Sequence, residues 1–139
     1  MAGIERCKGL TLIELLVVMA ILAIIGTIAI PFYTDYVDEA RIHTTRQNAE
    51  PLRLALEDYF LDETTYIAGT WIPSGANTLE TGDLGWRPDS DGNQYRYSVV
   101  AGATGIATSY TLTVTSVDGR ATIQCNRDQT AGTFVCDTL

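Results

Sequence analysis

The sequence predicts an α+β protein in which a long N-terminal helix packs its second half on an antiparallel sheet of three to four strands. Residues 15–33 contain no charge, residues 34–61 carry apolar side chains at helical spacing, and residues 94–125 are rich in Tyr, Val and Thr. The chain has 139 residues, which is enough for one modest domain beyond the apolar run. A multidomain enzyme is therefore excluded.

The apolar run is long enough to cross a membrane. As a helix its 19 residues reach about 28 Å, close to the roughly 30 Å hydrocarbon thickness of a bilayer. Arg6 and Lys8 precede it, and such a positive flank orients a span with its N-terminus in the cytoplasm and the rest exported. A secretory signal would be shorter and would end at a small-residue cleavage site. We therefore expect an anchor.

One acidic residue, Glu14, lies at the start of this anchor. A carboxylate within a span costs roughly 2.5–3.5 kcal/mol on insertion scales, so a partner or a function is expected for it. The alternative is that Glu14 stays near the interface and keeps its carboxylate hydrated.

Residues 34–61 are predicted to continue the helix with one packing face. Pro31 and Pro51 each remove a backbone donor and are expected to kink it. The apolar positions near three- and four-residue spacing are Val37, Ala40, Thr44, Leu52, Leu56 and Tyr59.

The C-terminal half is predicted to hold a structured loop and then the sheet. Residues 62–88 are polar and rich in Gly, with Trp71 and Trp86 expected to cover a core edge. The pair Asp118 and Gly119 separates two strand-like runs, which is a strong hairpin signal. The predicted strands are residues 94–101, 109–117 and 120–125.

The formal net charge of −8 argues against general affinity for nucleic acid or anionic lipid. Among the three cysteines, Cys7 lies on the cytoplasmic side of the anchor, where thiols stay reduced, whereas Cys125 and Cys136 lie on the exported side. A disulfide between these two is the expected state. Two free thiols or half of a metal site are the alternatives.

The segment KGLTLIELLVV, residues 8–18, followed by an apolar helix, resembles the N-terminus of a type IV prepilin. The resemblance implies that a prepilin peptidase cuts between Gly9 and Leu10 and that the new N-terminal residue, Leu10, is N-methylated. Thr11 and Glu14 match the motif, and the matching Glu is expected to pair with the Leu10 amine of a neighbouring subunit during assembly. Two positions depart from the pattern: residue 10 is Leu where Phe is commonest, and Ala23 replaces a frequent helix glycine.

The same resemblance implies an organisation for the whole chain. Residues 1–9 would be a cleaved leader, 10–33 the transmembrane and filament-core half of the helix, and 34–61 its amphipathic half. Residues 62–139 would form the loop, the sheet and a C-terminal region bounded by a disulfide, matching Cys125 and Cys136. Loss of the leader removes one acid and two bases, which changes the formal charge from −8 to −9.

Pro31 matches a family proline that marks a segment able to unfold during assembly; a kink where the helix leaves the bilayer is the alternative. The implied partners are further copies of the chain in a helical filament, the prepilin peptidase, the inner-membrane assembly machinery and the membrane itself. The chain is expected to be an inner-membrane single-pass precursor that becomes part of an extracellular pilus serving adhesion, motility or DNA uptake.

Two related functions stay open. A type II secretion pseudopilin shares the motif, but its major member typically binds calcium and lacks the disulfide; residues 89–93 depart from a calcium loop because Gln94 and Val100 stand where Gly and Glu are required. A minor DNA-binding pilin would use Arg41, Arg46 and Arg53, but interspersed acids argue against DNA as a partner.

No enzyme activity, cofactor or metal is predicted. The lone His43 has no nearby nucleophile or ligand cluster in the sequence.

Overall fold

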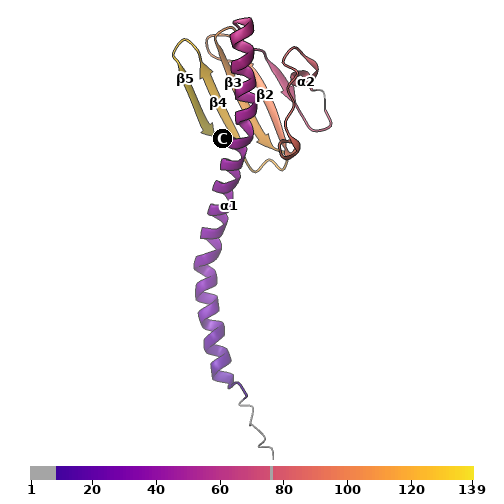
Figure 1. Cartoon of the computed structure of the whole chain (residues 1–139). Coiled ribbons are helices and arrows are strands. Elements are labelled where there is room, and N and C mark those ends of the chain that lie inside the picture. The colour runs from indigo at the N-terminus through magenta and orange to yellow at the C-terminus, as the bar shows by residue number, and fades with distance from the viewer. Residues whose placement is uncertain (1–8, 76) are drawn as a thin grey trace, which may run out of the picture. The chain divides into compact units, whose positions relative to one another are not determined.

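The computed structural model describes residues 9–75 and 77–139. The chain divides into two compact units, Met1–Val37 and Asp38–Leu139. The elements along the chain are one long helix, a three-residue strand, a short helix, a 3-10 helix and four longer strands (Figure 1). Their bounds are α1 Leu12–Glu63, β1 Gly69–Trp71, α2 Thr78–Thr81, η1 Ser90–Gln94, β2 Tyr95–Ala101, β3 Ser109–Ser116, β4 Thr122–Asp128 and β5 Thr133–Thr138.

The α+β prediction is confirmed, and the sheet is larger than expected. Its five strands lie in the order β1-β2-β3-β4-β5, and every neighbouring pair is antiparallel. The additional strands are the two edges, β1 within the predicted loop and β5 within the predicted C-terminal region. Both are short, with three and six residues, so their sequences give little alternation from which a strand could be predicted.

The core of the second unit lies between α1 and one face of the sheet. The helix contributes Thr45, Ala49, Leu52 and Leu56, which repeat every three or four residues and are almost fully buried. The predicted Leu52 and Leu56 are correct, whereas Thr44 is exposed and its neighbour Thr45 is buried in its place. Thr45 can occupy a dry position because its hydroxyl donates to the carbonyl of Arg41 at 2.8 Å.

The sheet presents alternate residues to this core. Leu112 and Val114 of β3 pair with Cys125 and Ile123 of β4, and all four are buried. Tyr97 of β2 lies among the aromatic residues at the β1 side of the sheet. Ring centroids of Trp71 and Trp86 lie 6.1 and 5.1 Å from that of Tyr97, both edge-to-face.

Both tryptophans therefore cover the core edge, as predicted. Trp71 is buried and Trp86 is partly buried against the same cluster. The hairpin prediction is confirmed as well, since β3 and β4 are joined through Asp118 and Gly119, with Gly119 at φ 72°. The turn is longer than the predicted two residues, because Ser116 and Ala121 form its closing hydrogen bond.

Candidate functional site

The N-terminal motif forms a capped helix start. Residues 9–11 precede α1, which begins at Leu12, so Thr11 occupies the N-cap position and Glu14 the third helical position. The Thr11 backbone N–H and hydroxyl donate to Glu14 Oε2 at 3.4 and 3.3 Å, and the Glu14 N–H donates to Thr11 Oγ1 at 3.3 Å. This reciprocal arrangement is a capping box.

The capping box gives Glu14 a local partner, Thr11, that was not predicted from the sequence. The Thr-x-x-Glu spacing is the sequence signal that indicates it. The carboxylate accepts from the backbone N–H and the hydroxyl of the N-cap residue Thr11, and it also complements the positive end of the helix dipole. It is thereby held in the first turn of α1, close in sequence to Leu10. Both cap contacts of the carboxylate are made by Oε2.

The bond between Gly9 and Leu10 lies in an open segment. Leu10 is 75% exposed, and a Cβ added at Gly9 would meet nothing within 4 Å. The rest of the predicted leader, residues 1–8 with Cys7, lies outside the described residues.

The first part of α1 exposes an apolar surface. Among the described residues α1 is the one helix apolar enough to cross a membrane, with a mean hydropathy of 2.8 over its most apolar window and none of that window buried. Pro31 does not interrupt the helix, and its carbonyl accepts a hydrogen bond from the Thr34 hydroxyl at 2.8 Å. Pro51 also lies within the continuous helix, so neither proline ends it.

The predicted disulfide is present between Cys125 and Cys136. The two residues face each other directly across β4 and β5, with Cα atoms 4.0 Å apart. The bridge therefore links the two strands of the β4–β5 hairpin and does not close an irregular loop. It ties the edge strand β5 to the interior of the sheet.

A polar network joins α1 to the same hairpin. Arg127 Nε donates to Glu57 Oε1 at 2.8 Å, and its Nη2 donates to Glu57 Oε2 at 3.4 Å. The Tyr66 hydroxyl lies 3.3 Å from Glu57 Oε2 and 3.3 Å from the Gln129 side-chain oxygen. We interpret this network as a structural contact, because its two charged side chains, Glu57 and Arg127, already pair with each other.

The predicted arginine stripe on α1 is mostly neutralised. Arg41 pairs with Asp38 at 2.9 Å, and Arg53 pairs with Glu50 at 2.7 Å, both one helical turn apart. Within the described part of the chain, four exposed arginines form no ion pair: Arg46, Arg87, Arg96 and Arg120.

The polar turn at residues 89–93 and the lone His43 do not form a site among the described residues. Residues 90–94, at the predicted polar turn, form η1, and His43 is exposed on α1. Over residues 9–75 and 77–139, no three His, Cys, Asp or Glu side chains converge as metal ligands would.

Comparison with known proteins gives matches along most of the chain. The prokaryotic N-terminal methylation motif matches residues 5–30. The family described as "Type IV minor pilin ComP, DNA uptake sequence receptor" matches residues 31–135. No solved structure matches the chain significantly.

Individual relatives are fimbrial proteins. The chain is 31% identical over 102 residues to the "Probable minor fimbrial protein" of Dichelobacter nodosus, covering 73% of this chain and 61% of that protein. It is 38% identical over 71 residues to a fimbrial protein of Neisseria meningitidis, covering 51% and 38% of the two chains. It is 40% identical over 55 residues to the type IV major pilin PilE1 of Neisseria gonorrhoeae, covering 40% and 33%. The chain thus spans less than two thirds of the length of these relatives.

The methylation motif, the apolar helix and the disulfide-bridged antiparallel sheet define a type IV pilin subunit. Within that class, the chain belongs to the family of type IV minor pilins of the ComP type.

Proposed function

We propose that the protein is a prepilin that is cut between Gly9 and Leu10 and then polymerises through the apolar part of α1 into a pilus. The observation that carries this proposal is the exposed apolar surface of α1, whose most apolar window has none of its residues buried within the chain. Such a surface requires a bilayer or other apolar helices around it. The bilayer would surround this surface before assembly, and the apolar helices of neighbouring subunits would surround it in the filament core.

In this proposal the capping box prepares Glu14 for assembly. Cleavage would create a largely cationic amine at Leu10, the residue directly before the Thr11 cap of the helix whose first turn holds Glu14. A neighbouring subunit's amine could then pair with this carboxylate in an apolar core, where each charge is costly alone. The partners are the peptidase, the inner-membrane assembly machinery and other subunits, and the role is structural rather than catalytic.

The test is the intact mass and N-terminal sequence of the protein in filaments sheared from cells. We expect a chain that starts at Leu10, carries one methyl group and lacks two hydrogens at the cysteines. A full-length chain confined to the membrane fraction would contradict the proposal. Replacement of Glu14 by Val should abolish incorporation into filaments while leaving the amount of precursor in the membrane unchanged.

A second candidate function is binding of duplex DNA by the exported head, residues 38–139. The family match over residues 31–135 favours it, because that family is described as a DNA uptake sequence receptor. From the sequence alone, the net charge of −8 argues against DNA as a partner. The structure nevertheless leaves four exposed guanidinium groups without an acidic partner among the described residues, and these can contact phosphates. They belong to Arg46, Arg87, Arg96 and Arg120.

DNA binding can be tested by fluorescence anisotropy with labelled duplexes at several salt concentrations. Removing one arginine that contacts a phosphate should weaken binding and reduce the salt slope by about one unit. Arg96→Ala and Arg120→Ala are the informative variants, and Arg53→Ala is the matched control because Arg53 already pairs with Glu50. Affinity that does not depend on salt or on Arg96 and Arg120 would contradict this function.

A further inference from the structure

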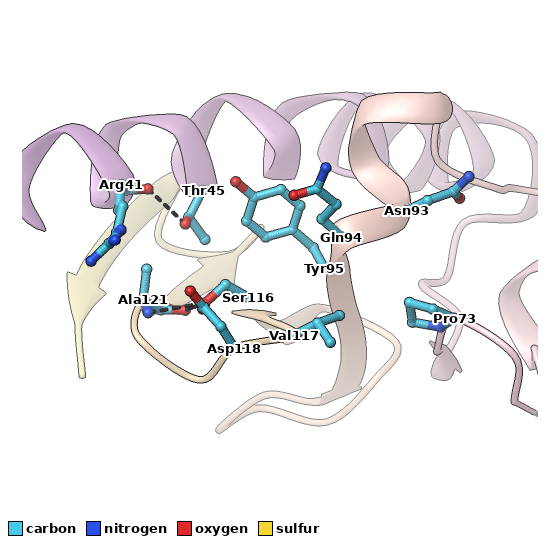
Figure 2. Close-up of a pocket in the computed structure, with 10 residues that line it drawn as sticks. All are labelled: Arg41, Thr45, Pro73, Asn93, Gln94, Tyr95, Ser116, Val117, Asp118 and Ala121. Atoms are coloured by element: carbon cyan, nitrogen blue, oxygen red, sulfur yellow. Dashed lines mark hydrogen bonds between the residues drawn. The ribbon is translucent and has the colours of Figure 1, made fainter. Parts of the chain in front are cut away.

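The head contains an open pocket that neither pilus assembly nor DNA binding explains. Its volume is about 550 Å³, within the range of small-molecule sites. Figure 2 shows its walls, which come from α1, from the junction of η1 and β2, and from the turn between β3 and β4. Its lining includes five polar or charged side chains that can contact a ligand: Arg41, Asn93, Gln94, Tyr95 and Asp118.

Three polar side chains in this pocket have no hydrogen-bond partner among the described residues. These are the solvent-exposed amides of Asn93 and Gln94 and the hydroxyl of the partly buried Tyr95. The Gln94 backbone is engaged, since its carbonyl accepts from the Val117 N–H at 2.8 Å. The main chain is therefore fixed while the side-chain amide is available to a ligand.

The charges of the pocket are balanced. The lining has one cation and one anion, Arg41 and Asp118. Arg41 is already paired with Asp38 at 2.9 Å. Asp118 Oδ1 accepts from the Ser116 hydroxyl at 2.6 Å and the Arg120 N–H at 3.1 Å, and these bonds lower its pKa, so it stays ionised near neutral pH.

This balance selects against two classes of ligand. A phosphate or a nucleotide would meet no uncompensated cation in the pocket and would approach a protein of net charge −8. A fully apolar molecule would cover the Asn93 and Gln94 amides without forming hydrogen bonds to them. A neutral molecule rich in hydroxyl groups satisfies both constraints.

We propose that this pocket binds a neutral sugar of one or two rings. The Asn93 and Gln94 amides each present a donor and an acceptor that can bond adjacent hydroxyl groups. The free oxygen of Asp118 accepts from a further hydroxyl and the Tyr95 hydroxyl bonds another, while the Tyr95 ring offers an apolar wall to the carbon face of the sugar ring. The site lies within the head and does not involve the apolar part of α1, so it is independent of the assembly motif.

The test uses the full chain in a zwitterionic detergent, because detergents with sugar headgroups would compete. Glucose, galactose, mannose, N-acetylglucosamine and N-acetylgalactosamine are titrated while side-chain and backbone amide resonances are followed by NMR. At least one sugar should shift the Asn93 and Gln94 amides saturably. Inorganic phosphate and a deoxynucleoside monophosphate should leave them unchanged.

Gln94→Ala and Tyr95→Phe should each weaken the affinity about three- to tenfold, the effect of one lost hydrogen bond. Gln47→Ala is the matched control, because Gln47 is an exposed amide on α1 that does not line the pocket. The unchanged core resonances of Tyr97 and Leu112 confirm that each variant folds.

Three results would overturn the proposal. The first is a shift of the Asn93 and Gln94 amides with phosphate or nucleotide but with no sugar, and the second is the lack of a saturable shift with any of the five sugars. The third is a shift that depends on protein concentration, which would assign the pocket to a second copy of the chain. Sugar binding measured on an immobilised glycan, compared with the free sugar, separates the end of a larger glycan from a free monosaccharide as its source.

Discussion

Individual residues of this chain have roles that depend on what they touch and not on their type alone. Thr11 and Thr45 are both threonines on α1 or at its start, yet one caps the helix for Glu14 and the other fills a dry core position by bonding to Arg41. Among the tyrosines, Tyr97 and Tyr110 are almost completely buried. The Tyr110 hydroxyl has no partner among the described residues.

At the residue scale, the cap can be tested with Thr11→Val and Thr11→Ser. Loss of the hydroxyl should cost about 1 kcal/mol of local helix stability, so amide hydrogen exchange in the first turn of α1 should accelerate roughly fivefold in the Val variant and little in the Ser variant. Thr27→Val is the control, since that hydroxyl bonds only to the Ile24 carbonyl. Equal exchange in all three variants would remove the capping role.

The buried tyrosines predict a pH dependence. Burial raises the pKa of Tyr97 and of Tyr110, so the folded state favours the neutral phenol. The unfolded chain therefore releases protons first as the pH passes about 10, and the free energy of unfolding should fall with increasing pH above that value. Absorbance at 295 nm should show part of the seven tyrosines ionising only as the protein unfolds. A single ionisation step for all of them in the folded protein would contradict this prediction.

At the scale of elements, two contacts hold the C-terminal hairpin. The disulfide joins β4 to the edge strand β5, and the Glu57 to Arg127 pair joins β4 to α1 across 70 sequence positions. Neither contact is visible as a local pattern. Together they explain how a short edge strand with mostly exposed side chains is held in place.

Removal of the disulfide should lower the free energy of unfolding by about 3 kcal/mol. The bridge spans 11 residues, and chain-entropy reasoning for a loop of that size gives about this value. The double variant Cys125→Ala and Cys136→Ala, unfolded with urea, is compared with the oxidised protein. Addition of a reductant should destabilise the parent protein and leave the double variant unaffected; a parent protein that is equally stable with and without reductant would contradict the prediction.

Breaking the Glu57 to Arg127 pair should cost about 1–3 kcal/mol, because Arg127→Leu leaves a half-buried carboxylate with fewer partners. Arg41→Ala is the matched control at an exposed one-turn pair, where the expected change is below about 1 kcal/mol. Urea unfolding of both variants measures the difference. Equal losses would show that burial and the Tyr66 contact add nothing to the ion pair.

On the scale of the whole molecule, the chain consists of two units with different requirements. The described part of the first unit, residues 9–37, exposes apolar side chains that need a membrane or a filament, whereas residues 38–139 contain their own hydrophobic core. The first unit supplies insertion and assembly in the proposed function. The second supplies the surface that meets solvent and ligands.

A fragment of residues 38–139 should therefore fold without detergent. Its core residues Leu52, Leu56, Leu112 and Ile123 all lie inside the fragment, as does the disulfide. We expect a cooperative urea transition and the late-ionising tyrosines of the full chain. A fragment that aggregates, or that binds a dye for exposed apolar surface, would show that the first part of α1 is needed for folding.

The sequence by itself determined the α+β class, the apolar anchor, the methylation-type motif and the β3 to β4 hairpin. These follow from local patterns, namely an uncharged helical run, a short motif, period-two alternation and an Asp-Gly turn. It also predicted the bond between Cys125 and Cys136, because both are expected on the exported side of the membrane.

Only the tertiary structure decided which faces pack and which groups meet. The edge strands β1 and β5 form because neighbouring strands offer them unpaired backbone groups, and Thr45 is buried because the register of α1 on the sheet places it there. The pairing of Glu57 with Arg127 and the pocket between α1, η1 and the β3 to β4 turn arise from long-range packing. No short window of sequence contains such contacts, because their members come from distant segments that meet only in the folded chain.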